Sequence, residues 1–362
     1  MARKLRDPIE RSLQAADGVT AETLHQLAQE VGTSNHPLVS VIGPHTASLA
    51  TAIQSLDMHP VIGLLLTAAR ESTPGIFAHA VNGMCLAGAM FLQQPCDKIT
   101  LPNALLGGLL HDIGNLYLNP LVLSDQQQTD LQTFKQIAIH PRIGRLLLEE
   151  LTDYPSELWT AIDEHHERMD GSGYPAGKTG DDTSDLGKLL AIAEVVVSLA
   201  LESSPTPMAN ARLALRFVPT EFDNRWTQLF LLPDASQGAS PETTVDSASV
   251  AEQVTQFNTL MASALAEAAA LIKKTGSRRG TADWVAQLAQ LRLQKLQKAW
   301  AETGLWAMAE GQANGENTDS EALLKELRYR LGRTRQDIVM CSGELPDAEA
   351  QKLYALRDIL AW

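Results

Sequence analysis

The sequence predicts an all-α protein on three observations. Apolar residues recur at steps of three and four along most of the chain, which is the spacing of an amphipathic helix. No stretch shows the sustained apolar–polar alternation of a strand, and aromatic residues, which strands favour, are only 5% of the chain. The pair Asn82-Gly83 has no alternating run on either side, so it predicts no hairpin.

Length, composition and charge bound the class of protein. The 362 residues suffice for about two domains, and 44% hydrophobic with 20% charged residues is typical of a globular chain. The formal net charge of −14 argues against nucleic acid or an anionic membrane as a partner. A protein of this charge that handles phosphate needs a local cation.

The cysteines and the apolar stretches predict a cytoplasmic protein. The three cysteines are an odd number without paired spacing, which favours a reducing compartment over a disulfide framework. The start of the sequence is charged and lacks the apolar core of a signal peptide. The longest apolar stretches, around residues 61–69 and 186–201, are shorter or more interrupted than the ~18 apolar residues of a membrane span.

Four regions are expected along the chain. They are an N-terminal helical region (1–70), a central domain (71–230), a linker or loop rich in Ser, Thr, Pro and Gly (231–248), and a C-terminal helical region (249–362). Two amphipathic helices are predicted in the last region, with apolar faces at Val254, Phe257, Met261, Leu265, Ala268 and Ile272, and at Trp284, Leu288, Leu291 and Trp300. This region has no histidine, so we expect a helical cap or, alternatively, a surface for a partner or a homodimer.

Ligand-type side chains alternate with apolar helical segments in the central region. They are His79, His111, Asp112, His140, His165, His166 and Glu194. Pro141 suits the first turn of a helix, so His140 is expected at a helix start. Helices that pack together can bring such side chains into one core. The histidines outside this pattern, His25, His36, His45 and His59, are interpreted as surface or core residues.

This set of residue types fits metal-assisted phosphoester chemistry. A pair of metal ions activates water, neutralises phosphate charge and stabilises the leaving oxygen. An aspartate can bridge two ions because its oxygens diverge, and imidazoles complete each site without adding negative charge. A mixed set of imidazoles and carboxylates favours iron or manganese over a structural zinc site.

The motifs resemble the HD-GYP branch of the HD phosphohydrolases. The resemblance rests on His111-Asp112-Ile113-Gly114, on His140-Pro141, and on the stretch HHERMDGSGYP at residues 165–175. It covers about residues 70–205 and implies an HD-type helical bundle with helical additions at both ends. It also implies two or three iron or manganese ions and hydrolysis of cyclic di-GMP, in which a metal-bound hydroxide attacks the phosphodiester.

The resemblance assigns roles to individual residues. One ion would be held by His79, His111, Asp112 and Glu194, and the other by Asp112, His140, His165 and His166. The predicted catalytic residues are Asp112 and Asn115. The predicted substrate-binding residues are Asn115, Arg142, Gly173, Tyr174 and Pro175. Asp170 is expected to fix the loop that carries the last three by bonding to its backbone.

Four positions depart from the family pattern. Asn115 stands where the family has a lysine that touches substrate phosphate, and Arg142 or Lys188 is a candidate to replace that charge. Glu194 stands where the distal ligand is usually aspartate. Gly75 stands where members with three metals have a glutamate, so two ions are expected here. The segment after Glu194 lacks the family's cluster for gripping the nucleotide.

Three functions therefore stay open at this stage. The leading prediction is a di-metal phosphodiesterase of cyclic di-GMP or a related cyclic dinucleotide. The second is a signalling module that binds metal without efficient turnover. It would also bind a nucleotide or, through the loop at Gly173-Tyr174-Pro175 (the GYP loop), a partner protein. The third is a hydrolase of other phosphate esters, against which the complete GYP stretch argues.

Overall fold

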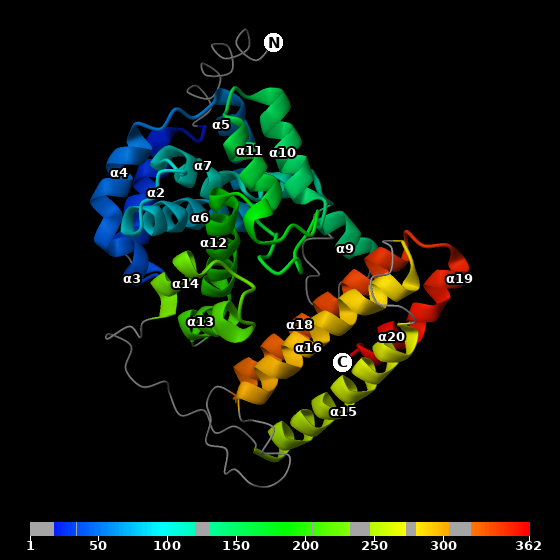
Figure 1. Ribbon diagram of the computed structural model, residues 1–362. Helices are drawn as coiled ribbons and strands as arrows, with labels where there is room; N and C mark the ends of the chain where they lie inside the picture. Colours follow the sequence, from blue (N-terminus) through cyan, green and yellow to red (C-terminus); the bar gives the residue numbers. More distant parts are fainter. Residues whose placement is uncertain are drawn as a thin grey trace. The chain divides into compact units, whose positions relative to one another are not determined.

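The computed structural model describes residues 18–33, 35–119, 131–204, 206–231, 247–272, 280–303 and 320–362. Within these ranges every regular element is a helix (Figure 1). The one β feature in them is an isolated bridge between Asp170 and Thr179. The all-α prediction is confirmed. The chain forms two compact units, Met1–Thr129 with Gln136–Arg216 and Thr220–Ser236, and Asp130–Lys135 with Phe217–Pro219 and Gln237–Trp362.

The first unit carries the site. Its α-helices are α2 (Ala21–Thr33), α3 (Val39–Ile42), α4 (Thr46–Gln54), α5 (Pro60–Ser72), α6 (Pro74–Gln93), α7 (Leu101–Leu110), α10 (His140–Leu151), α11 (Ser156–Glu164), α12 (Asp185–Leu201), α13 (Pro207–Phe217) and α14 (Asn224–Leu231). Short 3-10 helices are η1 (Gly43–His45), η2 (Ile113–Tyr117) and η3 (Gly180–Asp182), and α9 (Leu131–Ile137) belongs in part to each unit.

Local sequence explains where several of these helices begin. The side chains of Thr100 and Ser184 accept a backbone N–H at the starts of α7 and α12, and His59 does so at α5. Each bond satisfies a donor that has no partner within its own helix. Pro60 and Pro74 occupy the first turns of α5 and α6, where the missing N–H loses no helical bond.

Helices α6 and α7 lie at the centre of the core of this unit. Every residue of α6 from Ala80 to Met90 is buried, as expected for a helix that is apolar on all sides. By length and composition α6 is also the one helix in the described ranges that could cross a membrane. However, 67% of its most apolar window is already buried inside the protein, which is typical of a core helix.

The second unit is also helical. It contains α15 (Ser247–Leu271), α16 (Ala282–Thr303), α18 (Ser320–Ser342), α19 (Asp347–Ala350), η4 (Gln351–Leu353) and α20 (Tyr354–Ile359). Both predicted amphipathic helices are present as α15 and α16. The predicted apolar face of α16 is only partly correct. Trp300 is buried as expected, but Leu291 is 49% exposed, and the buried face contains Val285, Ala289 and Leu293. Alanines complete this face, and spacing of large residues alone does not identify them.

The face predicted for α15 needs a smaller correction. Val254, Phe257, Met261 and Ala268 are buried as expected. Leu265 is only half-buried, and Ala264 takes its place in the core. Ile272 follows the end of the helix. The predicted linker 231–248 falls mainly on residues 232–246, outside the described ranges, and the other predicted domain boundaries stay predictions.

Candidate metal centre

The structure brings the seven predicted metal ligands together in two groups that share one aspartate. Within each group the potential ligand atoms all lie within 4.8 Å of one another. The first group is His79, His111, Asp112 and Glu194, and the second group is Asp112, His140, His165 and His166. Asp112 lies between α7 and η2, so one short segment serves both groups.

The first group joins α6, the end of α7 and α12. The Nε2 atoms of His79 and His111 are 3.1 Å apart, and Glu194 Oε2 lies 2.8 Å from the former and 3.1 Å from the latter. Asp112 Oδ2 is 3.7 Å from His79 Nε2 and 3.9 Å from His111 Nε2. Ser198, one turn after Glu194 on α12, donates to the other carboxylate oxygen at 2.9 Å and so fixes the carboxylate.

A contact between two glycines explains how this group forms. Gly83 of α6 packs against Gly108 of α7 so closely that a Cβ on Gly83 would lie 2.5 Å from the Gly108 carbonyl oxygen. His79 lies one turn before Gly83, and His111 lies three residues after Gly108. The close crossing of the two backbones therefore brings the two imidazoles together, and any side chain at either glycine would separate them.

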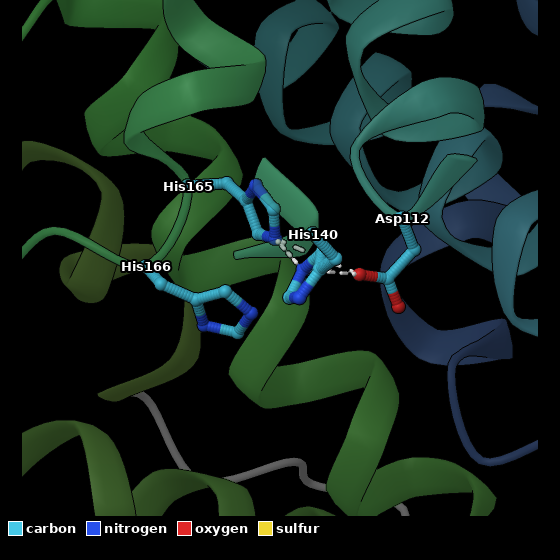
Figure 2. Close-up of side chains that lie close together, drawn as sticks. All are labelled: Asp112, His140, His165 and His166. Atoms are coloured by element: carbon cyan, nitrogen blue, oxygen red, sulfur yellow. Dashed lines mark hydrogen bonds and ion pairs between the residues drawn. The ribbon is translucent and has the colours of Figure 1, made fainter. Parts of the chain in front are cut away.

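The second group joins Asp112 to α10 and the end of α11 (Figure 2). His140 Nε2 lies 3.0 Å from Asp112 Oδ1 and 3.1 Å from His165 Nε2. His165 Nε2 lies 3.6 Å from the same oxygen. The first residue of α10 is His140, as predicted from Pro141.

A second glycine contact positions Asp112 against α10. A Cβ on Gly114 would collide with the carbonyl oxygen of His140 and with the backbone nitrogen of Gly144. Gly114 and Gly144 thus pack backbone to backbone. This contact holds the aspartate beside the second group of imidazoles.

The hydrogen bonds of three histidines leave their Nε2 atoms as acceptors. The Nδ1 atoms of His111, His140 and His165 lie 2.7–2.9 Å from the carbonyl oxygen three residues earlier. A carbonyl oxygen can only accept, so Nδ1 carries the proton and Nε2 carries a lone pair in each neutral ring. Such an outer hydrogen bond is the usual support of a metal-binding imidazole.

The donor set in the second group fits a cation. When both rings are neutral, His140 and His165 direct lone pairs at each other across 3.1 Å, and neither can donate to the other. Asp112 Oδ1 is buried beside them and has no hydrogen-bond partner. Three electron-rich atoms this close repel one another in the absence of positive charge. A divalent ion among them resolves this conflict, so the residues present fit a metal.

Neighbouring histidines lower the pKa values of the two carboxyl groups at the centre. Burial opposes ionisation of Asp112, but the neighbouring His111, His140 and His165 hold the pKa of this carboxyl well below its ordinary value. Glu194 is likewise buried, yet His79 and His111 hold its pKa well below the ordinary range.

The histidines respond in opposite directions. Burial opposes protonation of His79, but Glu194 and Asp112 outweigh it and raise the pKa of His79 to about 9. Burial, assisted by the other imidazoles, lowers the pKa of His165 to about 4 despite the nearby carboxylate of Asp112. Burial and His165 also lower the pKa of His166 well below 6.5.

The GYP loop folds back on the end of α11. Asp170 accepts from the backbone of Ser172 at 3.0 Å, which confirms its predicted role in the turn. A Cβ on Gly173 would lie 2.5 Å from the backbone nitrogen of Arg168, so only glycine fits there. The ring of Tyr174 stacks on His166, and Pro175 is exposed.

Two buried acids support this loop and were not singled out from the sequence. Glu167 accepts from the backbone nitrogens of Ala176 at 2.7 Å and Lys178 at 2.9 Å. Glu164 accepts from the Lys178 ammonium and from the backbone and hydroxyl of Ser184. Their sequence signal is the run DEHHE, in which acids flank the two histidines at the end of an apolar helix.

The remaining predicted site residues occupy varied positions. Asn115 lies in η2 beside Asp112, and its buried Oδ1 has no hydrogen-bond partner. Arg142 pairs with Asp163 at 2.9 Å, and it projects roughly 200° around α10 from His140. This pairing does not support Arg142 as a replacement for the family lysine. Lys188 is half-buried on α12.

Comparisons with known proteins agree with the geometry. Residues 67–221 match the family model for the HD domain. The chain is 27% identical to a cyclic di-GMP phosphodiesterase of Pseudomonas aeruginosa over 173 residues, which are 48% of this chain and 42% of the relative. Residues 67–221 form an HD-GYP-like domain. Both groups of ligand-type residues lie within it.

Other relatives match shorter parts of the chain. The 3'3'-cGAMP-specific phosphodiesterase 3 of Vibrio cholerae is 30% identical over 29% of this chain and 22% of its own length. A cyclic di-GMP phosphodiesterase response regulator of Xanthomonas campestris is 33% identical over 25% of this chain and 24% of its own. The chain thus spans less than half the length of these relatives.

Proposed function

We propose that this protein is a di-metal phosphodiesterase that hydrolyses a cyclic dinucleotide, with cyclic di-GMP as the first candidate. The observation that carries the proposal is the pair of ligand groups joined by Asp112. Relatives of the HD-GYP-like domain are named as phosphodiesterases of cyclic di-GMP and of 3'3'-cGAMP, which supports this class of substrate.

The choice of metal follows from the donor atoms. Each group offers imidazole nitrogens and carboxylate oxygens, and neither contains a cysteine. Mixed nitrogen and oxygen sites with open positions favour iron or manganese. We therefore propose two such ions, held by the first and the second group.

Bound ions would supply a nucleophilic water at neutral pH and would stabilise charge on the phosphate and on the leaving oxygen. The chain's own contribution is to hold the ligands. Asp112 presents its two oxygens to the two groups, and the Nδ1–H bonds of His111, His140 and His165 aim their lone pairs into the site. Asn115, next to Asp112, can donate a hydrogen bond to substrate but brings no charge.

A second candidate function is a signalling module that binds metal and nucleotide, or a partner protein at the GYP loop, with little turnover. The observation that favours it is Asn115, which replaces the cation usual in the family. The nearby Arg142 is paired with Asp163 and does not restore that charge. At this position no lysine or arginine is then available to bind the substrate phosphate or to stabilise the charge of the transition state.

One experiment separates the two functions. The purified full chain is first analysed for iron and manganese, and then assayed anaerobically with cyclic di-GMP and 3'3'-cGAMP plus ferrous iron or manganese. The proposed function predicts about two ions per chain and metal-dependent cleavage of a phosphodiester bond. Bound metal without cleavage would support the signalling module, and a chain that binds no metal would contradict both.

A further inference from the structure

The five histidines of the centre are not all held in the same way. Three are fixed by an Nδ1–H bond to a backbone carbonyl, and His79 Nε2 bonds to Glu194. Among the described residues, no hydrogen bond holds either ring nitrogen of His166. Its χ angles must be fixed in another way if it is to act as a ligand.

The contacts of His166 with the GYP loop supply that support. The rings of His166 and Tyr174 are stacked, with centroids 4.5 Å apart and planes inclined by 16°. The backbone N–H of Tyr174 also donates to the carbonyl oxygen of His166 at 3.1 Å. Gly173 makes this possible, because a Cβ there would collide with the His166 carbonyl oxygen.

We propose that Tyr174 is a positioning residue that orients His166 for metal binding by stacking on its ring. The stack takes the place of the outer hydrogen bond that the other imidazoles have. A ring that contacts both Tyr174 and the His165 ring, whose centroid is 4.1 Å away, has little freedom to rotate. This inference rests on the proposed metal centre and assigns the GYP tyrosine a task within it.

The loop has anchors other than the tyrosine side chain. Glu167 holds Ala176 and Lys178, and Asp170 holds Ser172, so the loop is anchored on both sides of Tyr174. Replacing Tyr174 by leucine should therefore remove the stacked ring and leave the backbone in place. Tyr174→Phe keeps the aromatic face and removes only the hydroxyl.

Manganese titration of the full chain by calorimetry tests the proposal. Tyr174→Leu is expected to lower the affinity for one of the two ions by about 10- to 100-fold, the usual effect of losing an outer support of a ligand. Tyr174→Phe should bind like the parent, and so should the control Tyr354→Leu, which removes an exposed tyrosine of α20. In a His166→Ala background, Tyr174→Leu should have no further effect.

Two results would overturn the proposal. One is an equal loss of affinity from Tyr174→Leu with and without His166, which would mean that the tyrosine acts through the loop. The other is parent-like binding by Tyr174→Leu. In metal-free protein, NMR three-bond couplings about the His166 side-chain torsions should show one fixed rotamer in the parent and rotamer averaging in Tyr174→Leu, with His111 unchanged. A parent that binds no manganese would refute the proposed function, while these couplings still decide whether Tyr174 orients His166.

Discussion

The two ligand groups share Asp112 but differ in charge. The first group combines two carboxylates with two imidazoles, whereas the second has one carboxylate and three imidazoles. In the absence of metal, the first group therefore keeps a proton, since the pKa of His79 is about 9. His165, with a pKa of about 4, stays neutral at pH 7. One aspartate thus joins a group that keeps a proton on His79 to a group in which His165 and His166 are neutral.

The electrostatic difference has a consequence for the ions. A cation that enters the first group has to displace the proton of His79, but it then gains attraction from two carboxylates. A cation that enters the second group meets His165 and His166, whose lowered pKa values leave their rings neutral at pH 7. We therefore expect affinity to depend more strongly on pH in the first group than in the second.

The largest effect is expected from Asp112→Ala, which removes the residue common to both groups. Both ions should be lost, and phosphodiesterase activity should fall by at least about 10³-fold, because the metal chemistry is lost as a whole. Metal content per chain and the rate of cyclic di-GMP cleavage measure this. Asp181→Asn, at an exposed acid in η3, is the control. Retention of both ions by Asp112→Ala would refute the bridging role.

Glu194→Gln should affect one group only. It removes the charge that lies 2.8 Å from His79, so one ion should bind about 100-fold more weakly while the other is retained. The pKa of His79 should also fall, which can be followed by NMR titration of the metal-free protein. Glu157→Gln, an exposed acid of α11, serves as the control. An equal loss of affinity for both ions would contradict the assignment of Glu194 to one group only.

The pH dependence of manganese binding sharpens the comparison further. Because the pKa of His79 is raised, its proton competes with the ion below about pH 9. The affinity of the first group should rise about tenfold per pH unit up to that value, and that of the second group should change less. Calorimetry at several pH values, in two buffers of different ionisation enthalpy, counts the protons released. Equal slopes for the two ions would contradict this account.

The smallest effect is expected from Asn115→Lys, which leaves both groups intact. Restoring a cation next to Asp112 should raise turnover about tenfold by stabilising charge on phosphate, without a change in metal content. Asn210→Lys, at a half-buried residue of α13, is the matched control. An unchanged rate would show that the missing lysine does not limit activity and would favour the signalling module.

Some features of the centre followed from sequence and others did not. The identity of the seven ligand-type residues was predictable because their motifs are local, as with His111-Asp112 and His165-His166. The supporting acids Glu164 and Glu167 were missed, because their partners Lys178 and Ser184 lie on a loop whose path is set by tertiary contacts. The pairing of Arg142 with Asp163 was missed for the same reason.

The sequence by itself determined the helical class and the kinds of side chain available for metal binding, since helix periodicity and short motifs depend on neighbouring residues. Tertiary structure decided which atoms meet. The backbone contacts of Gly83 with Gly108 and of Gly114 with His140 and Gly144 bring distant segments close enough to form two groups around Asp112. Packing there also sets the opposite pKa shifts. Glu194 and Asp112 outweigh burial and raise the pKa of His79, whereas burial lowers the pKa of His165, and only the folded chain supplies these neighbours.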